Sequence, residues 1–166
     1  PRDLPEWAQG STIEVSPHDP ATAYVAATRY KFDDNRPYLF KTADYGKSWR
    51  RITKGIPDHD FTRVIREDPA RPGLLYAGTE SGAYVSLDDG ASWQSLKGNL
   101  PAVSIYDLKV KDSDLVAASH GRSFWVLDDL TPLRQFTGEI KRNSVHLFAP
   151  RPTYRMLPQV GAIPGG

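Results

Sequence analysis

A nine-residue pattern that occurs twice, 44 residues apart, most constrains what this chain can fold into. Residues 41–49 read KTADYGKSW and residues 85–93 read VSLDDGASW, so a hydroxyl residue, Asp, Gly, Ser and Trp recur at the same spacing. A repeat of about 40–50 residues is typical of proteins built from small stacked sheets. The period therefore favours the four-stranded blades of a β-propeller.

The segments before each pattern repeat as well, and a third, looser copy follows. In each copy an apolar run ends in a turn that contains Asp or Pro and then leads into a second apolar run. The paired runs are 13–20 with 23–28, 64–69 with 74–79, and 107–112 with 115–119, the last of which is followed by 123–129.

The local pattern predicts an all-β chain with three four-stranded antiparallel blades, because short β-branched or aromatic runs alternate with turn residues. Residues 1–150 are expected to form a partial propeller with blades over 11–53, 61–96 and 103–137. An extra strand is expected over 144–149, and an irregular tail over 151–166. The expected strands are 11–16, 23–29, 37–42 and 48–53, then 62–67, 74–79, 82–87 and 92–96, then 104–110, 114–119, 123–128 and 133–137.

The repeated pattern has a physical interpretation as a hairpin device. An Asp carboxylate can accept hydrogen bonds from the N–H groups of its own turn, and Gly supplies the positive φ that the turn requires. The Trp then starts the next strand and can bury its ring between adjacent sheets. The residues that form the two copies are Thr42, Asp44, Gly46 and Trp49, and Ser86, Asp88, Gly90 and Trp93.

These two copies resemble BNR, or Asp-box, repeats, which occur in sialidases, xyloglucanase-like glycoside hydrolases and the sortilin/VPS10 ectodomain. Residues 74–79 (LLYAGT) and 120–134 (HGRSFWVLDDLTPLR) resemble large bacterial sortilin-like propeller proteins, which are often described as glycosyl hydrolases. The resemblance covers residues 5–150 or so. In the third unit Leu130 stands where the Gly should be and no Trp follows, so that hairpin is expected to be built differently.

The resemblance implies that the Asp-box lies on an outer turn, away from the binding face, so that Asp44, Asp88 and Asp89 are structural. It also favours a secreted or periplasmic protein, although the compartment stays open. The chain starts at Pro1 without a signal sequence, and we interpret it as a fragment or a processed piece.

Candidate ligand-binding residues follow from comparing the loops after the second strand of each unit. Each loop has a small hydroxyl residue followed by a large polar one, and the large residue differs between units. Propellers gather such loops around one axis, so these side chains could face one pocket; the alternative is a set of solvated or mutually paired loop ends. The candidates are Arg29, Glu80, His120 and Arg122.

Composition narrows the function classes. The chain has no Cys, which excludes disulfides and Cys-ligated metals, and we expect no cofactor and no metal. The acidic loops 33–35 and 58–60 could attract calcium, but turn chemistry explains both. The net charge is +1 without a basic run, so we expect no nucleic-acid partner, and no apolar stretch is long enough to span a membrane.

Two functions remain open. The first is a non-catalytic module that binds a peptide, protein or glycan, or acts as a scaffold, through loops on one face. The second is part of a glycoside hydrolase with catalytic carboxylates partly outside this chain; whether the chain is enzymatic is uncertain, and the lack of a second acidic loop residue beside Glu80 favours binding. Three blades cannot close a ring, so we also expect self-association, most simply as a dimer with six blades, unless further chain completes the ring.

Overall fold

The computed structural model describes residues 1 and 3–154 and contains three antiparallel sheets. Sheet 1 has the order β1-β2-β3-β4, sheet 2 the order β5-β6-β7-β8, and sheet 3 the order β11-β10-β9. The strands of sheet 1 are β1 (Gln9–Val15), β2 (Ala23–Arg29), β3 (Asp34–Thr42) and β4 (Arg50–Arg51). Those of sheet 2 are β5 (Thr62–Glu67), β6 (Leu75–Thr79), β7 (Ala83–Ser86) and β8 (Gln94–Ser95), and those of sheet 3 are β9 (Ile105–Lys111), β10 (Asp114–Ser119) and β11 (Phe124–Leu127).

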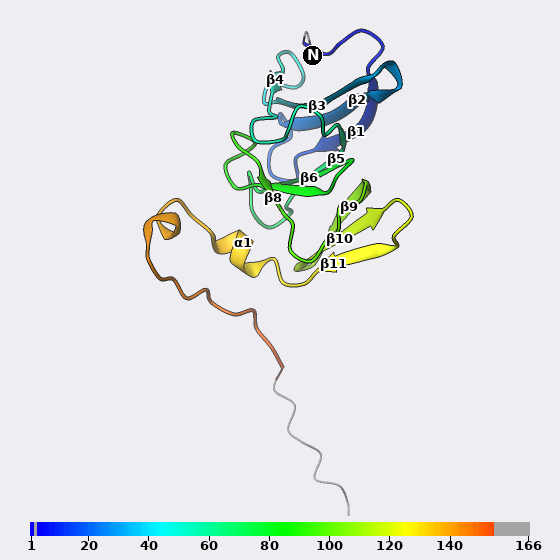
Figure 1. Ribbon diagram of the computed structural model, residues 1–166. Coiled ribbons are helices and arrows are strands. Elements are labelled where there is room, and N and C mark those ends of the chain that lie inside the picture. Colours follow the sequence, from blue (N-terminus) through cyan, green and yellow to red (C-terminus); the bar gives the residue numbers. More distant parts are fainter. Residues whose placement is uncertain (2, 155–166) are drawn as a thin grey trace, which may run out of the picture.

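The sheets lie face to face in chain order, with sheet 2 in the middle (Figure 1). Their first strands are neighbours: Arg66 on β5 donates to Glu14 on β1 at 3.0 Å, and to Asp107 and the Leu108 carbonyl on β9 at 2.8 and 2.9 Å. One guanidinium thus joins the first strands of all three sheets. The fold class is the predicted one, an open set of propeller blades without a closed ring.

Both predicted hairpin devices form with the same hydrogen bonds. The Asp44 carboxylate accepts from Thr42 Oγ1 at 2.8 Å and from the Ser48 N–H at 2.9 Å, while the Gly46 N–H donates to Thr42 Oγ1 at 2.9 Å. The second copy repeats each of these bonds between its equivalent residues, Ser86, Asp88, Gly90 and Ser92, within 0.1 Å. The bonds from Ser48 lower the pKa of Asp44 to about 2. These carboxylates therefore serve their own turns.

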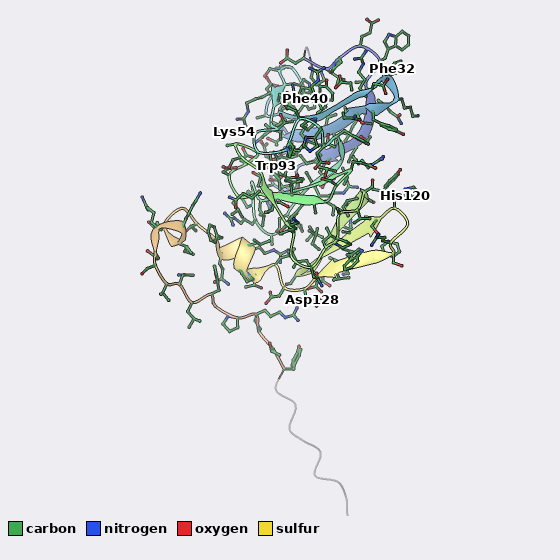
Figure 2. All side chains as sticks on the ribbon, viewed as in Figure 1. Phe32, Phe40, Lys54, Trp93, His120 and Asp128 are labelled. Atoms are coloured by element: carbon green, nitrogen blue, oxygen red, sulfur yellow. The ribbon has the colours of Figure 1, made fainter. Side chains whose placement is uncertain are left out.

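The Trp of the second copy joins two sheets. The ring of Trp93 is 3% exposed and packs against Ile52 and Ile56, which follow sheet 1 in the chain. Its indole N–H donates to the Ile52 carbonyl at 2.6 Å, and its backbone N–H donates to the Lys54 carbonyl at 2.8 Å. Figure 2 shows Lys54 and Trp93 close together between these sheets. Trp49 has no sheet before it, remains half-buried, and donates to the Gly46 carbonyl of its own turn.

The third sheet differs from the prediction, because its fourth strand over 133–137 does not form. Residues Thr131–Gln135 form the short helix α1 instead. Pro132 has no N–H for a ladder and suits the first turn of a helix. Arg134 on this helix donates to the fully buried Asp68 of sheet 2 at 3.0 Å, and Leu130 is buried in the core between sheets 2 and 3.

The extra strand expected over 144–149 is also wrong. Residues 145–150 have no regular structure, and Val145 and Leu147 are 85% and 93% exposed. The Ala149 backbone instead pairs with the Gln135 side chain at 2.9 and 2.8 Å, which holds this segment beside α1. After the 3-10 helix η2 (Ile140–Arg142) the chain is irregular through residue 154, and the rest of the expected tail, 155–166, lies outside the described residues.

No helix in the described part of the chain is both long and apolar enough to cross a membrane.

The two Trp residues should therefore differ in their contribution to stability. Replacing Trp93 by Ala should lower the free energy of unfolding by about 3–5 kcal/mol, because it empties a closed site between two sheets. Replacing Trp49 by Ala should cost less than half as much, because that ring is already half in water. Urea unfolding of both variants measures the difference, and equal losses would contradict the role of Trp93 as an inter-sheet contact.

Candidate ligand-binding site

The candidate site lies at the end of the sheets where each second strand turns into the third, which we call the loop end. The two repeated Asp-Gly hairpins, 42–49 and 86–93, follow the third strands and so lie at the opposite end of the sheets. At the loop end Thr79 Oγ1 accepts from the Gly82 N–H at 3.2 Å, and Ser119 Oγ donates to the Ser123 carbonyl at 2.6 Å. The repeated hydroxyl residue therefore closes the loops of sheets 2 and 3. In sheet 1 this loop contains the 3-10 helix η1 (Tyr30–Phe32) instead, and Thr28 Oγ1 has no partner among the described residues.

The structure brings two of the four candidate residues to one point. Ser104, just before β9, donates its hydroxyl to Glu80 at 2.7 Å, and its carbonyl accepts from the His120 N–H at 2.9 Å. Glu80 and His120 come from sheets 2 and 3, so this contact spans the boundary between them. The His120 ring is exposed and lies 4.9 Å from the ring of Tyr106, measured between centroids.

The other two candidates lie apart from this point. Arg29 forms an ion pair with Asp34 at 3.5 Å and its guanidinium lies over the Phe32 ring at 5.4 Å, so its contacts stay within sheet 1. Arg122 is exposed in the turn between β10 and β11, and within residues 3–154 its side chain makes no hydrogen bond or ion pair. Figure 2 shows Phe32 and His120 on the same side of the molecule, with Trp93 away from them.

A row of aromatic rings around Arg63 crosses the loop end from sheet 1 to sheet 3. Tyr30 stacks on Phe61 with centroids 4.8 Å apart and an interplanar angle of 10°. The Arg63 guanidinium lies 4.8 Å from the Phe61 ring and 4.1 Å from the Tyr106 ring. We call these four residues, Tyr30, Phe61, Arg63 and Tyr106, the aromatic row.

The aromatic row is held by an ion pair and presents two rings to solvent. Arg63 donates to Glu80 at 2.6 and 3.0 Å, and only 14% of its side chain is exposed. Tyr30 is 36% and Tyr106 47% exposed. A buried cation between aromatic faces fixes the rings in place, and such preset rings with a polar edge are well suited to stacking on a ligand.

The carboxylates near this end are engaged by protein donors. Asp34 accepts a bidentate pair from Arg36 at 2.9 and 2.8 Å and a bond from the Tyr38 hydroxyl, and the Arg36 bonds hold the pKa of Asp34 well below its ordinary value. Asp60 is 1% exposed and accepts from Thr79, Ser81 and Tyr84. Burial, with the bond to Asp60 as the next cause, raises the pKa of Tyr84 to about 12. A glycosidase acid needs a raised carboxyl pKa, whereas the pKa of Asp34 is lowered.

Each of the two acidic loops considered for calcium has one carboxylate, Asp34 or Asp60, engaged in these internal bonds. Asp34 and Asp60 are buried, and Asp33 adopts a left-handed conformation that ends η1. Within residues 3–154, no group of three or more His, Asp or Glu side chains is arranged to hold a metal ion.

Sequence reasoning found the polar loop residues and missed the aromatic row. Glu80 and His120 occupy equivalent loop positions in their units and differ in residue type, so the sequence identifies them. The aromatic row forms from residues at non-equivalent positions of three units. The available signal was Tyr106, an aromatic residue at an outward-facing position directly after Ile105. Phe61 and Tyr30 carry no such signal, because only the stacking of sheets 1 and 2 brings them together.

Comparison with known proteins adds support for the fold alone. A scan against protein-family models finds no match, and neither does a search of curated proteins. Among solved structures, the chain is similar to YCF48 bound to D1 peptide (19% identity, TM-score 0.51) and to the GH74 enzyme of Niastella koreensis (14% identity, TM-score 0.56). A third is YCF48 from Cyanidioschyzon merolae, with 17% identity and a TM-score of 0.52.

These structures are β-propellers, and the chain spans less than half of each. The similarity covers 73% of this chain and 37% of the peptide-bound YCF48, and 72% of this chain and 21% of the GH74 enzyme. For the Cyanidioschyzon protein the shares are 73% and 40%. At this identity the likeness establishes the propeller architecture of the three sheets.

Removing Arg63 should cost more than breaking its ion pair. We expect Arg63→Ala to lower the free energy of unfolding more than Glu80→Ala, because Arg63 also packs against three rings. A double-mutant cycle should give a coupling of about 1 kcal/mol or less, because Glu80 is 45% exposed on its side chain. Chemical denaturation of the four proteins measures this. The exposed pair Lys111–Asp112 is the matched control and should show a coupling near zero; a larger coupling there than for Arg63–Glu80 would contradict the assignment.

Proposed function

We propose that this chain is a non-catalytic part of a β-propeller that binds a peptide, protein or glycan through its loop end. The observation that carries the proposal is the aromatic row, in which an ion-paired Arg63 fixes rings from three sheets and leaves Tyr30 and Tyr106 partly exposed. Interfaces favour Tyr and Arg for this reason: they offer large contact areas with few side-chain rotations to freeze.

Polar groups beside the row supply directional contacts. His120 lies against Tyr106 with its ring exposed, and Arg122 extends a free cation from the next turn. Arg29 lies at the other end of the row, next to Tyr30 in the chain, and faces Phe32. A ligand that lies along the row would meet apolar rings in its middle and polar groups at both ends, which suits an extended chain of residues or sugars.

The alternative is a contribution to a glycoside hydrolase, which the likeness to GH74 enzymes keeps open. In this reading the aromatic row is a platform for sugar rings, and the catalytic carboxylates lie partly outside this chain. Glu80 is the acidic residue closest to the row, but it is committed to Arg63 and Ser104. The peptide bound in the YCF48 structure is consistent with the binding function for this fold.

We also propose that the ring is completed by self-association. The outer face of sheet 1 exposes Ile13 (74%) and Val15 (63%), and the outer face of sheet 3 exposes Phe124 (74%) and Val126 (54%). In the middle of the stack the corresponding sheet faces are buried. Two copies that pack sheet 1 on sheet 3 of the partner, twice, would cover all four faces around a two-fold axis with six blades.

Ligand binding can be tested with two probes, cellohexaose and an extended 12-residue peptide that contains two aromatic residues. We expect at least one probe to bind, and Tyr106→Ala to weaken it about tenfold, which corresponds to about 1.4 kcal/mol of lost stacking. Isothermal titration calorimetry measures the affinities. Tyr45→Ala is the matched control, because Tyr45 is an exposed Tyr on an Asp-box turn at the opposite end, and it should bind normally.

Equal weakening by the two Tyr variants, or no binding of either probe, would overturn the proposal. Release of reducing ends from cellohexaose by the wild-type protein, abolished in Glu80→Gln, would establish the hydrolase alternative instead.

Self-association can be tested by size-exclusion chromatography with light scattering. At micromolar concentration we expect a mass of two chains for the wild type, and a shift to one chain for Ile13→Glu, because a carboxylate on the packed face would lose its hydration. Val145→Glu is the control, since Val145 is 85% exposed and belongs to no sheet, and it should stay dimeric. A well-folded wild-type monomer would refute this proposal.

A further inference from the structure

At the boundary between sheets 1 and 2, the segment after sheet 1 and Trp93 together form a complete packing site. At the boundary between sheets 2 and 3, only the equivalent segment after sheet 2 is repeated. After sheet 1, the Ile52 N–H donates to the Leu39 carbonyl at 2.9 Å and the Ile56 N–H donates to the Thr53 carbonyl at 3.1 Å. The same two backbone bonds recur 44 residues later in the chain. The Leu96 N–H donates to the Ala83 carbonyl and the Leu100 N–H donates to the Lys97 carbonyl, both at 2.8 Å. Ile52, Lys54 and Ile56 thus correspond to Leu96, Gly98 and Leu100.

The two boundaries differ in what fills the site. At the first, Trp93 leads into β8 and covers Ile52 and Ile56, which are 2% and 6% exposed. At the second, residues 3–154 give sheet 3 three strands and no Trp at the equivalent place, and Leu96 and Leu100 remain half-exposed. A cavity of about 90 Å³ lies there, lined mainly by apolar side chains that include Leu96, Leu100, Leu115, Trp125 and Leu127. We call it the empty Trp slot.

The strand beside the slot has an unpaired edge. β11 pairs with β10 on one side, and within residues 3–154 no strand pairs with the other side. In sheet 2 the corresponding strand β7 pairs with β8 through Tyr84↔Ser95 and Val85↔Gln94. An apolar slot beside a free strand edge is the combination that binds peptides by strand addition, since the backbone gives affinity and the slot selects a side chain.

We propose that the empty Trp slot and the free edge of β11 form a docking site for an extended segment of another polypeptide that carries a Trp. The segment would pair with β11 as β8 pairs with β7. Its indole would enter between Leu96 and Leu100, with its N–H donating to the Leu96 carbonyl as Trp93 does to the Ile52 carbonyl. Its Trp backbone N–H would meet the Gly98 carbonyl, as the Trp93 N–H meets Lys54.

Within residues 3–154 the chain does not supply the occupant itself, because it turns away from the slot after β11. After β11 the backbone enters α1, which is tied to sheet 2 by the buried Arg134–Asp68 ion pair. The next apolar segment, Val145–Phe148, is held beside α1 through Ala149 and Gln135. The site is separate from the loop end, because β8 and β11 are outer strands and the slot lies on the side of Leu96 and Leu100. It therefore stands independently of the proposed ligand site.

The test uses the chain's own slot-filling strand as probe, a synthetic peptide of residues 91–97 (ASWQSLK) with a fluorescent label. Anisotropy should rise on titration with the full chain, and the peptide with Ala in place of Trp should bind at least tenfold more weakly. Leu100→Glu should weaken binding of the Trp peptide similarly, because it places a carboxylate in the slot. Leu147→Glu is the matched control, since Leu147 is 93% exposed beside α1, and it should bind like the wild type.

Hydrogen exchange of the wild-type chain provides a readout that does not depend on variants folding. Bound Trp peptide should slow amide exchange in Phe124–Leu127, and should leave exchange in the Asp-box turns unchanged. Equal binding of the Trp and Ala peptides, or unchanged exchange in β11 at saturating peptide, would overturn the proposal. Peptide-induced dissociation of a wild-type dimer would also overturn it, because the slot would then be filled by a second copy of this chain.

Discussion

The contact of Trp93 with the segment after sheet 1 is the interaction on which the rest of the structure depends. A four-stranded sheet of this size cannot bury both faces alone, so each needs a neighbour. Trp93 supplies a large apolar ring and two inter-sheet hydrogen bonds at the outer rim, while Arg66 joins the first strands at the other side of the stack. With the sheets fixed at both margins, their loops are brought to a common end.

Much of the fold could be predicted because its determinants are local and repeated. The bonds of the two repeated hairpins run within residues 42–48 and 86–92, so the pattern alone specifies the turn and the start of the next strand. Eleven of the twelve strands expected in the three blades are present. The twelfth fails for one local and one long-range reason. Pro132 disfavours a ladder, and Arg134 donates to the buried Asp68, which lies 66 residues earlier. No local sequence pattern predicts an ion pair between residues so far apart in the chain.

The candidate site was predictable only in part, for a related reason. Comparing equivalent loop positions found Glu80 and His120, which differ between units and which Ser104 does bring together. It also selected Arg29 and Arg122, whose side chains make no contact with that pair. The rings of the aromatic row occupy non-equivalent positions: Tyr30 lies in a 3-10 helix, Phe61 just before β5 and Tyr106 in β9. They meet only because neighbouring sheets pack side by side.

The open surfaces of the stack call for two different kinds of partner. The outer faces of sheets 1 and 3 are wide and apolar, with Ile13 and Phe124 both 74% exposed, so only another sheet can cover them. The empty Trp slot is narrow and lies beside one free strand edge, so a single strand with one large ring suffices. Closing the ring would leave the slot unfilled, because a neighbouring sheet contacts the far face of sheet 3, whereas the slot opens between sheets 2 and 3. Ring closure and strand addition are therefore separable events, and a complete ring could still accept a strand at its rim.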